Sequence, residues 1–542
     1  MGKNKTNFLV QGSILAMAGI LVRVIGIIYR VPVNNILGEE GVTYYGTAYD
    51  VYSLFLLISS MSMPLAVSKI VSAKVAKKQI RNAYRAFIGS MVIGMIIGAV
   101  VSCIIFFGAD LFASLWGYPS AAYAIRVLAP VLFIMSVLGV LRGFFQGMGT
   151  MIPTAISQIL EQIANAIVSV VGAMFLFKAG KAAGESAAYG AAGSTLGTLV
   201  GATVALVFLL FVYMLYAPVI KRQINKARYT KPESYRNLSK ELIYTILPVL
   251  LSTTIYNFSS ILDSGVFGNI CSHIFDMTEK EYASMYGVYS GSYKLITTAP
   301  IAVASALSSA IIPSIIRSVI EGNRVMTHKK IESSMRLTMI ITIPAGVGLA
   351  VLAGPILNLL FNLERLEEAT AIMRLAPFTV VVFAMSTISN AVLQGIDKMK
   401  TPIINAAISM VIHYIVLALM LIIGKPNLYA VVIGDIVFGL VVCILNAIAI
   451  YRYIGYRQEI LKTFILPAFA AAIMGIFAIG VYKGIYLLIK SNAVSCIFAI
   501  CVAVCVYAVA LLLVRGIGED EILMMPKGKS IVGLLRRLHL LK

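Results

Sequence analysis

Two arginines lie within the first long apolar stretch of this sequence. Arg23 and Arg30 are seven residues apart, so on a helix they share one face. Lys294 lies in a similar apolar stretch of the second half of the chain. A cation among apolar residues is costly unless it faces water or an anion. Because guanidinium groups in particular bind phosphate oxygens well, we predict a hydrated, cation-lined cavity that takes an anionic substrate.

Acidic residues inside the apolar stretches are fewer. Asp50 lies near the outer end of the second stretch, Asp263 near that of the seventh, and Glu161 one-third along the fifth. Glu161 follows Gln158 in a polar stripe, which indicates hydrogen bonds between helices as readily as substrate contact. For Arg30, Asp50 and Asp263, extension of the side chain to the membrane interface is an equal alternative. The candidate substrate-binding residues are therefore Arg23, Arg30, Lys294, Glu161, Asp50 and Asp263.

The amino-acid composition indicates that a lipid bilayer surrounds these apolar stretches. The 542 residues are 60% hydrophobic and only 12% charged, whereas roughly a quarter of the residues in a soluble protein are charged. Apolar stretches long enough to cross a bilayer recur along the whole chain, and in lipid such stretches must be helices. We predict an all-α polytopic membrane protein with about fourteen transmembrane helices, at 8–33, 46–72, 86–108, 123–145, 153–177, 187–216, 241–266, 284–314, 333–359, 370–391, 402–423, 428–450, 462–482 and 493–515.

The net charge of +21 would suggest a nucleic-acid partner for a soluble protein. Here the basic residues lie in short loops, at 74–85, 221–240 and 317–330, each of which follows an even-numbered span. The loops after several odd-numbered spans are acidic. Because Lys and Arg mark cytoplasmic loops, we predict that both termini are cytoplasmic. We expect no nucleic-acid partner, and contact with membrane lipids instead.

The chain offers little for metal or covalent chemistry. Its six cysteines and four histidines have no pairing or ligand spacing, and five of the cysteines lie in apolar stretches. No loop exceeds roughly 20 residues, so we expect no extramembrane domain. We therefore predict no catalytic residue, no metal and no cofactor, and a transporter rather than an enzyme.

Short motifs recur in the two halves of the chain. The Leu-Ala-Pro of 128–130 recurs at 375–377, the Gln-Gly of 146–147 at 394–395, and the Pro-Leu-Ala-Val of 64–67 resembles 300–303. An offset of about six spans preserves orientation, so parallel repeats with a substrate site between them are predicted. The expected parts are an N-lobe of six spans with a basic linker (1–240), a C-lobe of six spans (241–456), and two further spans with a basic cytoplasmic tail (457–542).

Several motifs in the first half resemble those of a known superfamily. They are Gly12-Ser13 leading to 23–26 (Arg-Val-Ile-Gly), the stretch 64–69 (Pro-Leu-Ala-Val-Ser-Lys), the stretch 142–147 (Arg-Gly-Phe-Phe-Gln-Gly), the stretch 153–158 (Pro-Thr-Ala-Ile-Ser-Gln), and Glu161-Gln162. The sequence is thereby similar to the multidrug/oligosaccharidyl-lipid/polysaccharide exporter superfamily. Within it, the sequence resembles the SpoVB/MurJ-like flippases of bacteria, which act on lipid II or other polysaccharide precursors.

The resemblance implies a function as well as a fold. It implies two six-helix lobes, two C-terminal helices that line a lipid groove, and alternating access that moves a polyprenyl-diphosphate-linked saccharide out across the bacterial cytoplasmic membrane. It also implies that Arg23, Arg30 and Lys294 hold the diphosphate, with lysine replacing the usual arginine at 294. Vegetative cell-wall synthesis and sporulation are both open as settings. We expect a monomer driven by a coupling ion or the membrane potential.

Two other functions remain as alternatives. A drug/cation antiporter of the same superfamily would need converging acidic residues, for which Asp263 and Asp435 are candidates. A membrane glycosyltransferase would need acidic residues in an outer loop, where Glu39 and Glu40 lie, together with a sizeable extramembrane region.

Overall fold

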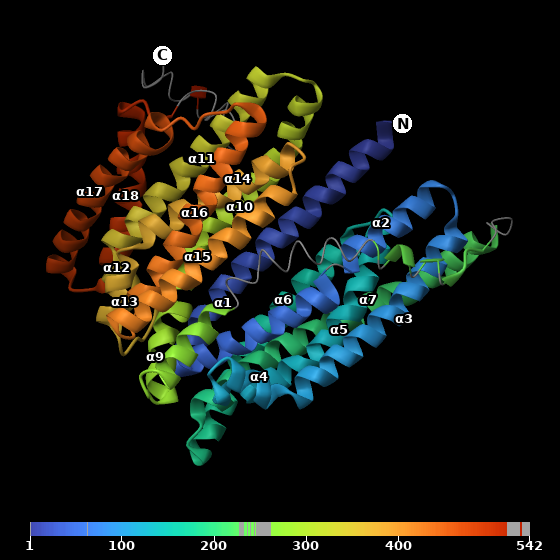
Figure 1. Ribbon diagram of the computed structural model, residues 1–542, viewed down its shortest axis with the longest axis horizontal. Helices are drawn as coiled ribbons and strands as arrows, with labels where there is room; N and C mark the ends of the chain where they lie inside the picture. The colour runs from blue at the N-terminus through green and yellow to red at the C-terminus, as the bar shows by residue number, and fades with distance from the viewer. Residues whose placement is uncertain are drawn as a thin grey trace. The chain divides into compact units, whose positions relative to one another are not determined.

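The computed structural model describes residues 2–61, 63–226, 232–235, 237–238, 240–242, 244, 262–517 and 532–533 (Figure 1). Within these residues the regular structure is entirely helical. Eleven helices in this part of the chain are long and apolar enough to cross a membrane, and the first of them, Met17–Leu56, contains parts of two predicted spans. The prediction of an all-α polytopic membrane protein is therefore confirmed.

The first two predicted spans run into one another. Helix α1 (Gly2–Leu56) continues through the predicted acidic loop and is kinked at Gly38, where φ is 68° and ψ is 178°. A side chain would be strained in that conformation, so glycine allows the sharp kink at which two helical stretches meet. The second span then passes through the π-helical segment η1 (Leu57–Met61) into α2 (Met63–Ala76).

Helices α3, α5, α6 and α7 correspond to predicted spans, whereas α4 lies in a predicted loop and α9 lies mostly in one. The elements in this part of the chain are α3 (Ile80–Phe107), α4 (Ala109–Leu115), the 3-10 helix η2 (Pro119–Ala121), α5 (Ala122–Gly147), α6 (Ile152–Ala179), the 3-10 helix η3 (Gly180–Ala183), α7 (Ser186–Lys226) and α9 (Glu279–Gly287). A further helical segment covers 262–273. Most of the seventh predicted span, 241–266, lies outside the described residues.

The remaining helices belong to the second half of the chain. They are the π-helical segment η4 (Val288–Tyr293), α10 (Lys294–Ile320), α11 (Arg324–Val351), α12 (Ala353–Leu360), α13 (Leu366–Met373), α14 (Ala376–Gly395), α15 (Lys400–Gly424), α16 (Leu428–Ile454), the π-helical segment η5 (Leu461–Ile465), α17 (Leu466–Ile489) and α18 (Asn492–Leu513). The predicted basic tail lies almost wholly outside the described residues.

The chain divides into two compact units, Met1–Gly287 and Val288–Lys542. In the first unit, α2, α3, α5 and α7 share a hydrophobic core that includes Phe87, Phe144 and Phe145. Helices α6 and α7 approach so closely that a Cβ atom on Gly172 would lie 2.3 Å from the carbonyl oxygen of Gly193. Small residues permit such contacts between membrane helices.

The second unit is built around α10, α11, α14, α16 and α17, whose buried side chains form one hydrophobic core. The two C-terminal helices are part of this unit. Tyr507 of α18 donates a hydrogen bond to the carbonyl oxygen of Ile340 on α11 (2.8 Å), and Asn492 donates to that of Pro355 on α12 (3.0 Å).

Candidate functional site

The two first-span arginines lie on α1 within the first unit. Both side chains are exposed, as are their apolar neighbours Val24 and Ile28. The helix is unbroken between Arg23 and Arg30, so the seven-residue spacing places them on the same face. Both cations therefore project from an otherwise apolar surface of this unit.

Arg30 lies beside a cluster of tyrosines that sequence reasoning missed. Its neighbours there are Tyr29, Tyr45 and Tyr49. The hydroxyl groups of Tyr29 and Tyr45 are 3.4 Å apart, and the rings of Tyr45 and Tyr49 have centroids 4.7 Å apart. Tyr49 also hydrogen-bonds Thr198 of α7. The spacing of 45 and 49, one helical turn apart on α1, is a signal by which the cluster could have been found.

Glu161 of α6 is paired with a cation that was not among the predicted site residues. Arg142 Nη2 of α5 donates to Glu161 Oε2 at 2.6 Å, and Arg142 Nε donates to Ser157 Oγ at 3.1 Å. The side chain of Arg142 is 9% exposed and that of Glu161 is 23% exposed. The pair joins α5 to α6, and the carboxylate is neutralised within the first unit.

Asp50 and Asp263 come from distant parts of the sequence to the same region of the first unit. Ser264 Oγ, from the helical segment 262–273, donates to Asp50 Oδ2 of α1 at 2.6 Å. The neighbouring Asp263 is buried, with 2% of its surface exposed. Five of the six candidate residues therefore lie in the first unit, namely Arg23, Arg30, Asp50, Glu161 and Asp263.

Lys294 lies in the second unit, as the first residue of α10 and directly after the π-helical segment η4. Its Nζ is 5.9 Å from the centroid of the Tyr289 ring, within reach of a cation–π interaction. The hydroxyl group of Tyr289 donates to the carboxylate of Asp435 on α16. Lys294 and Asp435 thus contact opposite parts of one tyrosine, a relationship that joins residues far apart in the sequence.

The Tyr289 side chain is itself held in place. Its ring stacks on that of Tyr293, with centroids 5.8 Å apart, and the hydroxyl groups of Tyr293 and Thr379 are 2.6 Å apart. All three of Tyr289, Tyr293 and Thr379 are buried. The half-buried Lys294 is therefore supported by a rigid aromatic platform. Among the described residues, no group of three or more His, Cys, Asp or Glu could hold a metal ion.

Comparisons with known sequences agree with the resemblance. Residues 9–319 match the family described as "Polysaccharide biosynthesis protein". The chain is 26% identical over 481 residues to "Lipid II flippase MurJ" of Bacillus subtilis (strain 168), which covers 85% of this chain and 86% of that protein. It is 24% identical over 524 residues to "Stage V sporulation protein B" of the same organism, which covers 96% of this chain and 98% of that protein.

Solved structures share the fold. The lipid II flippase MurJ in an inward closed conformation superposes with a TM-score of 0.67 and 15% identity, over 92% of this chain and 98% of that one. An inward-facing multidrug resistance MATE family transporter of the MOP superfamily superposes with a TM-score of 0.66 and 18% identity, over 83% and 98%. At these identities the likeness concerns the fold alone.

Proposed function

Because this chain belongs to the polysaccharide biosynthesis protein family, within the MOP superfamily, we propose that it moves a polyprenyl-diphosphate-linked saccharide across the bacterial cytoplasmic membrane. The chain is a multi-pass flippase or exporter of this superfamily, and its relatives are transporters rather than enzymes. The finer proposal concerns the substrate, for which lipid II or a related cell-envelope precursor fits best.

The observation that carries this proposal is the pair of exposed arginines on one face of α1. Arg23 and Arg30 stand among exposed apolar residues of α1, which include Val24 and Ile28. A diphosphate carries close to two negative charges and several acceptor oxygens, and each guanidinium group offers a fork of donors to them. The tyrosines beside Arg30 hold its position, so less conformational entropy is lost on binding.

Lys294 would supply a third cation from the second unit. Its ammonium group acts as a point charge with three donors, so it attracts a phosphate without imposing bidentate geometry. In this proposal the three cations line a central cavity that opens alternately to either side of the membrane. An ion gradient or the membrane potential would drive the cycle, and one chain would suffice.

The decisive experiment is complementation. All lipid II flippases of a tractable bacterial host are depleted, and this chain is expressed from a plasmid with its membrane abundance quantified. We expect growth to be restored. Normal abundance without rescue would contradict lipid II as the substrate, and a parallel test in sporulation-defective cells would then distinguish a spore-specific precursor.

A drug/cation antiporter is a second candidate, because Asp435 places a carboxylate within the span formed by α16. Intramembrane carboxylates are what a cation-coupled exporter uses. In proteoliposomes, cation-dependent drug efflux that lipid II does not inhibit would favour this function over the first.

A further inference from the structure

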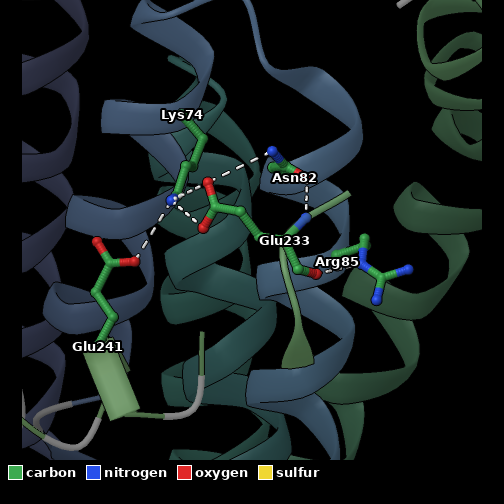
Figure 2. Close-up of polar contacts among 5 residues, drawn as sticks. All are labelled: Lys74, Asn82, Arg85, Glu233 and Glu241. Atoms are coloured by element: carbon green, nitrogen blue, oxygen red, sulfur yellow. Dashed lines mark hydrogen bonds and ion pairs between the residues drawn. The ribbon is translucent and has the colours of Figure 1, made fainter. Parts of the chain in front are cut away.

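The segment that links the two predicted six-span lobes is tied to the first unit by charged groups (Figure 2). Lys74 Nζ, near the end of α2, lies 2.6 and 2.5 Å from the two carboxylate oxygens of Glu233. It also lies 3.5 Å from Glu241 Oε2. The Lys74 side chain is only 12% exposed, so these two carboxylates replace most of its water.

The backbone at Glu233 is held as firmly as its side chain. Its amide nitrogen donates to Asn82 Oδ1 at 3.0 Å, and its carbonyl oxygen accepts from Arg85 Nε at 3.0 Å. Asn82 is buried, and its Nδ2 also donates weakly to Glu233 Oε1 at 3.4 Å. Asn82 and Arg85 are one turn apart on α3, so a single face of that helix fixes the register of the linker.

Apolar and aromatic contacts extend this attachment. The Arg85 guanidinium group lies 4.1 Å from the centroid of the Tyr235 ring. Leu238 and Leu242 are buried in the hydrophobic core that α2, α3, α5 and α7 share. The described part of the linker is therefore anchored to the first unit by buried side chains as well as by charged groups.

The attachment depends on a single carboxylate within the basic linker. The stretch 221–240 contains seven basic residues and a single acidic one, Glu233. No other side chain of that stretch can therefore replace Glu233 at Lys74. The Glu233 side chain is 33% exposed, so water can reach its carboxylate and take the place of Lys74 when the two separate. The carboxylates of Glu233 and Glu241 share the Lys74 ammonium group. When Lys74 moves away, the two carboxylates repel each other and the attachment of the linker weakens.

We propose that Lys74, Asn82, Arg85 and Glu233 form a clamp that holds the linker on the first unit in one state of the transport cycle and releases it in another. The inference rests on the proposed function, because alternating access requires the connection between the lobes to change shape. Element ends and connections absorb such motions. When several weak bonds depend on one another, they form and break together. Such a contact can switch the linker between a bound and a released state.

The closed clamp is tested by cross-linking in membranes without any substrate. A Cβ atom at Gly89 lies 3.5 Å from Tyr235 Cδ1, so the variant G89C/Y235C should cross-link rapidly in a background lacking the six native cysteines. We expect Glu233→Gln to lower the rate about threefold and Lys74→Ala, which strands two carboxylates, about tenfold. Lys74→Arg should retain most of the parent cross-linking rate.

A matched control is available in the second unit. Glu321 is paired with Arg317 at 2.9 Å in another basic loop, but both side chains are exposed. Glu321→Gln should leave the cross-linking rate unchanged. Equal rates in the parent, Glu233→Gln and Lys74→Ala proteins would overturn the clamp, whether or not the chain transports a lipid-linked saccharide.

Release is tested by locking the clamp. The oxidised G89C/Y235C protein should lose transport of a lipid-linked saccharide in proteoliposomes and regain it on reduction, while the single variant G89C stays active under both conditions. Full transport by quantitatively cross-linked protein would overturn the requirement for release. Absence of transport by the unsubstituted chain would count against the proposed function, and the cross-linking result would still decide the clamp.

Discussion

Arg142 and Glu161 form a largely buried ion pair between α5 and α6, with Arg142 Nη2 2.6 Å from Glu161 Oε2. Arg142 lies near the end of α5 and Glu161 about one-third along α6, on either side of the connection at 148–151. At the repeat-related position in the second half, Asn390 accepts a 2.7 Å hydrogen bond from Asn446. The two halves thus use different polar chemistry at corresponding places.

Breaking this pair should destabilise the fold. Arg142→Ala leaves the Glu161 carboxylate partly buried without its cation, so we expect the free energy of unfolding to fall by about 3 kcal/mol. The double variant Arg142→Met, Glu161→Leu removes both charges and should be more stable than Arg142→Ala. Thermal unfolding of the detergent-solubilised proteins measures both. A double variant less stable than either single variant would argue against the pairing.

Arg23 should be required for transport but not for folding. Arg23→Ala removes both the charge and the donors, and we expect it to abolish complementation at normal membrane abundance. Arg23→Lys keeps the charge without the planar fork and should be partly active. Arg324→Ala, at an exposed arginine at the start of α11, serves as the control. Full rescue by Arg23→Ala at wild-type abundance would show that a cationic cavity is the wrong mechanism.

Lys294 should tolerate arginine and not alanine. The Tyr289 ring can support either cation, so Lys294→Arg should complement growth, whereas Lys294→Ala should fail. A matched control is Lys398, whose Nζ lies 5.0 Å from the centroid of the Tyr453 ring in a different part of the second unit. Lys398→Ala should complement normally. Equal activity of Lys294→Ala and Lys398→Ala would remove Lys294 from the site.

The predicted orientation can be tested by labelling single cysteines in intact cells. Gln79 lies between α2 and α3, and Asn225 lies near the end of α7, both in basic segments that we expect in the cytoplasm. Gln79→Cys and Asn225→Cys should resist a membrane-impermeant thiol reagent. Lys280→Cys, at an exposed position of α9, should react. Labelling of either of the first two variants would require a different span map.

The acidic residue Glu279, at the start of α9, should make stability depend on pH. Its carboxylate accepts hydrogen bonds from the backbone nitrogen (2.9 Å) and the hydroxyl group (3.2 Å) of Ser120. Burial raises the pKa of Glu279 above its ordinary value, and these hydrogen bonds oppose the rise, while the nearby Glu40 carboxylate adds to it.

The sign of the effect follows from that raised pKa. The folded protein binds the proton more tightly than the unfolded chain, so stability falls as pH rises through the folded pKa. Glu279→Gln removes this loss, and should raise the unfolding temperature at pH 7.5 more than at pH 4.5. Thermal unfolding at the two pH values measures the difference. The same shift at both values would show that titration of Glu279 does not matter.

The positions of the spans follow from the sequence by itself, because in lipid a helix must satisfy its own backbone groups and the length of an apolar stretch sets its extent. The predicted span 402–423 corresponds to α15 (Lys400–Gly424), and 428–450 to α16 (Leu428–Ile454). The helix breaks within spans were not predictable. No glycine–proline pair marks the π-helical segments η1 and η4 in the sequence.

The candidate residues were recognisable from the sequence for a simple reason: a charge inside an apolar stretch stands out by its cost in lipid. Their partners were decided only by the tertiary structure. Arg142 finds Glu161 on the next helix, and Asp435 receives the Tyr289 hydroxyl from 146 residues away in the chain. Hydropathy is a local property of consecutive residues, whereas an ion pair or a shared tyrosine depends on which helix faces pack together. The proposed clamp has the same origin, since only packing against α2 and α3 brings Lys74 to the Glu233 carboxylate and Asn82 and Arg85 to its backbone.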